Sequence, residues 1–180
     1  MADDLDRQVN ETIGWFSKIY LGGIPSIITD DSAFLSFVCV VTGMEALSGY
    51  RYGDEALNNR FPRFIRTYFP KVYHCYADDL YEFRKKIVHA MSTGRFALTH
   101  HHSEVHLGTL GEATIILNAE DFYGAFLISA QEYFSDLRHS HELKVALTKR
   151  LASYGGGSIT VMPVTILDHG REVPSGESRT

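Results

Sequence analysis

The chain has 180 residues, of which 44% are hydrophobic and 22% charged, a composition typical of one soluble globular domain and unlike that of a disordered chain. Its formal net charge of -5 argues against a general nucleic-acid coat protein. The basic residues are concentrated in the segment 51–95.

The N-terminal stretch MADDLDRQVNETIGW is acidic and polar, which is the wrong character for a signal peptide. No apolar run approaches the roughly 20 residues that a membrane span needs. We therefore expect a cytoplasmic protein without a membrane partner.

Cys39 and Cys75 lie in apolar helical patterns without metal-ligand spacing, so buried, reduced thiols are expected.

Apolar residues recur at every third or fourth position in several stretches and predict helices. These helices are expected over residues 3–20, 34–49, 73–91, 119–137 and 140–153. The helix over 34–49 is apolar on most sides, which predicts a central position. Between it and the next one, Gly53, Pro62 and Pro70 favour short helical pieces and turns.

Residues 95–118 are rich in Thr, Val, Ile and Leu, with Gly108 and Gly111 between them, as expected of a two-stranded hairpin. The expected fold is mainly α: a helical bundle of four to six helices with a small antiparallel β-hairpin inserted after the helix over 73–91. Residues 1–180 are expected to form one domain, with a mobile end at about 170–180.

The histidines of 100-HHHSEVH-106 are weak candidates for metal ligands. Alternation along a strand would place His100, His102, Glu104 and His106 on one face. The alternative is a polar strand facing solvent, because a shift in register would separate the four side chains. No other cofactor is expected.

The stretch 60-RFPRFIRTYFPKVY-73 interleaves basic side chains with aromatic rings. Basic groups attract phosphates and aromatic faces stack on unpaired bases, so Arg60, Arg63 and Arg66 are candidate contacts to single-stranded RNA or a nucleotide. An ordinary amphipathic helix with aromatic rings in the core has the same pattern.

The segment 80-LYEFRKKIVHAM-91 contains Arg84 and His89. Five residues on a helix correspond to a rise of about 7.5 Å and a rotation of about 140°, so the two side chains should not point the same way. They could converge if the helix ends near His89, or if a second chain adds its own pair across a two-fold axis. An arginine that binds phosphate and a histidine that moves protons would suit metal-independent RNA cleavage.

Glu45 is the only carboxylate in the apolar helix. A buried carboxylate needs a partner, and a long arginine such as Arg84 is the best suited. A purely structural alternative is therefore open, in which Arg84 and Glu45 form a buried pair and His89 lies at the C-terminal end of its helix, where a cation is favoured.

Residues 80–91, following the helix that contains 43-GMEAL-47, resemble the HEPN superfamily of small helical nucleotide-binding domains, whose signature is Arg, a few residues, then His. The resemblance covers roughly residues 30–140. It implies a homodimer with the paired motifs in a cleft, and active members cleave RNA in toxin and defence settings. It also implies catalytic roles for Arg84 as phosphate clamp, His89 as acid or base, and Glu45 as the acidic residue of the partner helix.

In that interpretation the substrate-binding charge would come from Lys85, Lys86, Arg60, Arg63 and Arg66. Active members of the superfamily typically place Asn, Asp or His directly after the arginine, where this chain has Lys85. A second hypothesis is therefore a non-catalytic dimeric binding or scaffold module that kept the Glu45–Arg84 pair.

Overall fold

The computed structural model describes residues 2–154, so the segment at 170–180 that the sequence predicts to be mobile lies outside the described residues. Six α-helices make up most of the described chain: α1 (Ala2–Phe16), α2 (Ala33–Tyr52), α3 (Leu57–Tyr68), α4 (Ala77–Ala90), α5 (Ala119–His139) and α6 (His141–Ser153). The predicted mainly α-helical fold is confirmed. The expected interruption of residues 50–73 is wrong in part, because α3 continues through Pro62.

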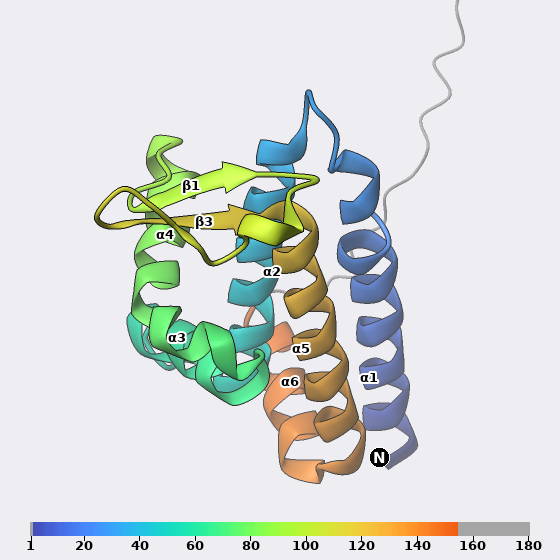
Figure 1. The fold of residues 1–180 in the computed structure, drawn as a ribbon. Helices are drawn as coiled ribbons and strands as arrows, with labels where there is room; N and C mark the ends of the chain where they lie inside the picture. The colour runs from blue at the N-terminus through green and yellow to red at the C-terminus, as the bar shows by residue number, and fades with distance from the viewer. Residues whose placement is uncertain (1, 155–180) are drawn as a thin grey trace, which may run out of the picture.

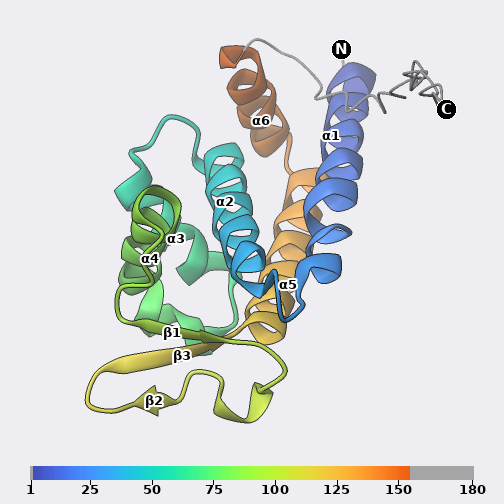
Figure 2. The same ribbon diagram turned by 90° about the horizontal axis from the view of Figure 1, so that it is seen from above.

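Helix α2 is the central element, as its apolar character predicts. It packs against α3 and α4 on one side and against α5 and α6 on the other, an arrangement visible in Figures 1 and 2. The expectation that no segment has the length and apolar composition of a membrane span is wrong for α2, of which 56% is buried inside the protein. Burial against four helices accounts for that composition.

The core between the helices is largely aromatic. Phe16 of α1 packs edge-on against Phe126 of α5, and Phe37 of α2 stacks on Phe122 of α5, with ring centroids 6.2 and 6.1 Å apart. Both cysteines are free, but the predicted burial of their thiols is wrong: Cys39 is only partly buried and Cys75 is exposed.

A small sheet covers one end of the bundle, where α4 ends and α5 begins (Figures 1 and 2). It contains β1 (Phe96–Thr99), β2 (Thr109–Leu110) and β3 (Thr114–Asn118) in the order β1-β3-β2. Strands β2 and β3 form the predicted antiparallel hairpin. Strand β1 was not predicted as a third strand, and it pairs with β3 in parallel. The two strands run in the same direction because the chain after Thr99 loops back across the end of the sheet before β2.

Gly43 of α2 marks a close approach of two helices. A Cβ atom at this position would lie 2.5 Å from Cζ of Phe126 on α5 and 3.1 Å from Cδ1 of Tyr20. Real Cβ atoms do not come this close to a neighbour, so the contact between α2 and α5 requires glycine here.

Gly43→Ala should therefore destabilise the protein by about 1–2 kcal/mol, because overpacking outweighs the better helix propensity of alanine. Urea unfolding measures the change in the free energy of unfolding. Gly14→Ala in α1 is the matched control, since a Cβ atom there meets nothing within 4 Å. It should stabilise by up to about 1 kcal/mol. Stabilisation by both substitutions would contradict close packing at Gly43.

Candidate functional site

Arg84 lies on α4 beside the buried residues of that helix and reaches α2. Its guanidinium Nη2 forms an ion pair with Oε2 of Glu45. The side chains of Arg84 and Glu45 are only 12% and 26% exposed, so the pair is mostly shielded from water. The predicted partnership between the one carboxylate of the apolar helix and this arginine is confirmed.

His89 lies next to the last residue of α4 and is exposed. The helix ends at Ala90 and is followed by Met91, whose backbone is left-handed with φ of 48°. The N–H of Ser92 donates back to the carbonyl of Lys86 over 3.2 Å. Nη1 of Arg84 lies 3.4 Å from Nε2 of His89. The two side chains therefore converge within one chain, because the arginine is long and the helix ends beside the histidine.

The contact defines the proton positions. An arginine only donates hydrogen bonds, so Nε2 of His89 is the acceptor and the proton of a neutral imidazole lies on Nδ1. The guanidinium is thus held from two sides, by the Glu45 carboxylate at Nη2 and by His89 at Nη1. The single lone pair of a neutral His89 thus faces Arg84, so a substrate group has to replace this contact before the imidazole can accept a proton.

Arg60 does not lie on the surface as the prediction of substrate contact requires. Its side chain is buried between α2 and α3, where Nη1 donates to the carbonyl of Glu45 over 2.9 Å and to Oγ of Ser48 over 3.1 Å. Burial, followed by the charge of Arg150, lowers the pKa of Arg60. Its role is structural, because it links α3 to α2.

The remaining predicted substrate contacts are exposed, and most have acidic partners. Arg63 pairs with Glu55 at 3.2 Å, and Arg66 pairs with Asp78 at 2.5 Å. On α4, Lys85 pairs with Glu82 at 3.0 Å, and Lys86 is exposed beside Gly94. The structure therefore places these charges on two helices, and Arg63, Arg66 and Lys85 each have an acidic partner.

The predicted strand face of histidines is wrong. Strand β1 ends at Thr99, and the following residues form a loop and a 3-10 turn over Ser103–Val105. His102 contacts Glu104 at 3.0 Å, whereas His106 turns inward. His100 and His101 instead lie near Asp30, with one potential ligand atom of each residue within 4.8 Å of the others.

His106 joins the sheet to the turn before α4. The N–H of Asn118 donates to Nδ1 over 3.0 Å, so the proton of the ring lies on Nε2 and is donated to the hydroxyl of Tyr73 over 2.7 Å. That hydroxyl donates to the carbonyl of Asp121 over 3.3 Å. Burial lowers the pKa of His106, against the opposite effect of the charge of Asp121. The network requires a neutral imidazole.

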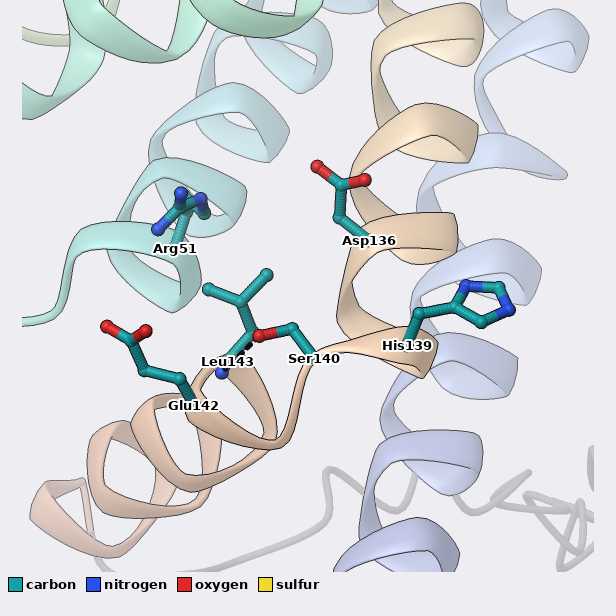
Figure 3. Close-up of a pocket in the computed structure, with 6 residues that line it drawn as sticks. All are labelled: Arg51, Asp136, His139, Ser140, Glu142 and Leu143. Atoms are coloured by element: carbon teal, nitrogen blue, oxygen red, sulfur yellow. Dashed lines mark hydrogen bonds between the residues drawn. The ribbon is translucent and has the colours of Figure 1, made fainter.

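A hollow with a volume of about 340 Å³ lies where α5 ends and α6 begins, lined by Arg51, Asp136, His139, Ser140, Glu142 and Leu143 (Figure 3). Nε of Arg51 donates to the hydroxyl of Tyr68, which donates to Asp136, over 3.1 and 3.0 Å. Burial raises the pKa of Tyr68 to about 12, so it keeps its proton.

None of the predicted site residues lines this hollow. Arg51 of α2 is distant in sequence from the other charged residues, which lie around the junction of α5 and α6, so no local pattern predicts their approach. The one local signal is Ser140, whose hydroxyl caps α6 by accepting from the N–H of Leu143 (Figure 3). Since Arg51 is already bonded to Tyr68, the hollow offers two carboxylates beside an engaged cation, which does not suit phosphate binding.

Glu45→Gln should lower the free energy of unfolding by about 1–3 kcal/mol, because it leaves the shielded cation of Arg84 without a counter-ion at unchanged side-chain size. Urea unfolding measures this loss. Glu82→Gln, which removes the exposed partner of Lys85, is the control and should cost less than about 0.5 kcal/mol. Equal effects of the two substitutions would show that the Glu45–Arg84 pair adds nothing.

His106 should make stability depend on pH. Its pKa in the folded protein lies below the ordinary value of 6.5, so its contribution is complete above pH 6.5 and is lost as pH falls through the folded-state pKa. We expect the thermal midpoint of the wild type to fall more between pH 7.5 and about pH 5 than that of His106→Gln. Parallel pH profiles would contradict a neutral, buried His106.

Comparisons of the chain with models of known protein families, with curated proteins and with solved structures gave no match. The resemblance to HEPN domains therefore stays a prediction from the motif around Arg84 and His89. The function of the chain has to be proposed from the contacts of its own residues.

Proposed function

We propose that this protein is a HEPN-like domain that binds single-stranded RNA or a nucleotide at Arg84 and His89, and that it cleaves RNA without a metal ion. One observation carries the proposal: the 3.4 Å approach of the Arg84 guanidinium to the imidazole of His89. A guanidinium beside an exposed imidazole is the combination of side chains that phosphodiester cleavage by a neighbouring hydroxyl needs.

The chemistry assigns a separate task to each side chain. A bound phosphate would replace His89 at Nη1 of Arg84, which frees the lone pair on Nε2 of neutral His89. That nitrogen then accepts the proton of the ribose 2′-hydroxyl while its oxygen attacks phosphorus, and Arg84 stabilises the negative charge on the phosphoryl oxygens. The bond between phosphorus and the 5′-oxygen then breaks, and that oxygen needs a proton. A protonated His89 of a second copy would supply it, which is the reason to propose a homodimer.

Glu45 acts in this proposal as a positioning residue. Its carboxylate holds Nη2 of Arg84, so Nη1 stays beside His89. The basic residues Lys85, Lys86, Arg63 and Arg66 would contact the RNA backbone. Exposed ion pairs contribute at most about 1 kcal/mol, so exchanging Glu82, Glu55 or Asp78 for a phosphate costs little. Arg60 has no part in this contact because it is buried.

A second candidate function is a non-catalytic dimeric binding or scaffold module. The observation that favours it is the engagement of Arg84, which is 12% exposed and already contacts both Glu45 and His89. Lys85 after the arginine favours it as well. In this case the three residues serve stability and dimer geometry, and RNA remains intact.

The test is incubation of the full-length protein with single-stranded model RNA in EDTA. Wild-type protein should cleave and leave 2′,3′-cyclic phosphate ends, and His89→Ala should lower the rate by on the order of 10²-fold or more. His139→Ala, which removes another exposed histidine at a helix end, is the matched control and should cleave like the wild type.

Binding without cleavage by the wild type, weakened in Arg84→Gln, would favour the binding module over the nuclease. A folded wild-type protein that neither cleaves nor binds RNA or nucleotides would overturn both arms of the RNA proposal. Mass photometry of the same samples measures the dimer, and a monomer at all concentrations would remove the source of the second His89.

A further inference from the structure

Two loops of the chain meet at the sheet end of the bundle. Asp30 lies in the loop before α2, and His100 and His101 follow directly after β1. Figure 2 shows the chain before α2 close to the loop that leaves β1. These residues are separated by about 70 positions in sequence, so their approach is a product of the fold.

The potential ligand atoms of these three residues are separated by distances close to those between the ligands of one metal ion. One carboxylate oxygen of Asp30 and one ring nitrogen of each histidine lie within 4.8 Å of one another. Nε2 of His100 is 3.4 Å from Oδ1 of Asp30. Ligands at about 2.0–2.2 Å from a tetrahedral ion lie roughly 3.3–3.6 Å apart, so this pair already has the required separation.

His100 has an unexplained polar atom. Its Nδ1 is buried and has no hydrogen-bond partner among the described residues. The other nitrogen of this ring, Nε2, faces the Asp30 carboxylate and is therefore the atom placed to bind an ion. An ion at Nε2 would leave the proton of the neutral ring on Nδ1. One edge of the ring is thus buried in the protein, and the other faces Oδ1 of Asp30.

His101 is oriented by a second carboxylate. Its Nδ1 lies 2.6 Å from Oε1 of Glu120 in the first turn of α5, so Nδ1–H donates and Nε2 keeps its lone pair. The backbone N–H of His101 donates to the same carboxylate, and the residue has φ of 59°. A histidine that donates one nitrogen to a carboxylate while the other faces an ion is the usual arrangement around protein metals.

Left-handed backbone at a residue other than glycine costs about 1–3 kcal/mol and persists only where surrounding contacts impose it. Both carboxylate oxygens of Glu120 lie 3.1 Å from the backbone nitrogen of His101, and one of them also contacts Nδ1 of its ring, so Glu120 holds the strained loop in place.

We infer that Asp30, His100 and His101 form a binding site for a divalent transition metal ion of the zinc class. Two imidazoles and one carboxylate suit zinc, cobalt or nickel, whereas magnesium and calcium prefer oxygen ligands throughout. Three protein ligands leave the fourth tetrahedral position to water, and Asp30 is 90% exposed, so the ion is accessible. The site shares no residue with Arg84, His89 and Glu45.

The test uses the full-length chain without a histidine tag, freed of metal by EDTA and dialysis. Calorimetric titration with Zn²⁺ should show one site, and Co²⁺ should give the visible absorption of a four- or five-coordinate ion. His101→Ala and Asp30→Asn should each weaken Zn²⁺ binding at least about tenfold, and Glu120→Gln by on the order of 10–100-fold. Thermal midpoints without metal establish that each variant is folded.

His102→Ala is the matched control, because His102 lies in the same loop but pairs with Glu104. It should bind Zn²⁺ like the wild type. Equal affinity of His101→Ala and His102→Ala would overturn the site, as would absence of binding by the wild type at millimolar Zn²⁺. The EDTA used in the RNA assay removes the ion, so loss of metal binding and loss of RNA cleavage are separate outcomes.

Discussion

The partly buried charge of Glu45 is the constraint on which the arrangement of the central helices depends. Its carboxylate binds Arg84 of α4, and its backbone carbonyl accepts a hydrogen bond from Arg60 of α3. A carboxylate shielded from water is unfavourable unless it is paired, so α4 can dock on α2 only in a position that brings Arg84 to it. One residue of α2 therefore fixes two neighbouring helices, and with them the place of His89.

Five of the six helices were predictable because their apolar residues recur with helical period, and α2 because it is apolar on most sides. Helix α3 was not, because Pro62 lies inside it. The β2–β3 hairpin was predictable from its turn-forming glycines and β-branched residues. The parallel pairing of β1 was not, because the direction of a strand depends on the path of the chain between Thr99 and Thr109. The loop that sets this path carries no regular period.

In the candidate site, the contact between Glu45 and Arg84 was predictable because a buried carboxylate needs a cationic partner. On an ideal helix Arg84 and His89 diverge, and the sequence predicted convergence within one chain only if the helix ends near His89, as it does. The prediction that the histidines of residues 100–106 lie on one face of a strand was wrong for another reason. Asn118 and Glu120 at the start of α5 accept the backbone N–H groups of His102 and His101, which keeps this segment out of the sheet.

The end of α4 has a consequence for motion. His89 lies in the final turn, which is closed by hydrogen bonds to the carbonyl of Lys86, while Arg84 is anchored one turn earlier through Glu45. Helix ends open locally at far lower free energy than the whole fold. Fraying of a single turn would thus separate the imidazole from the guanidinium and leave the core intact. Amide hydrogen exchange in this turn would therefore report how often Arg84 and His89 are separated.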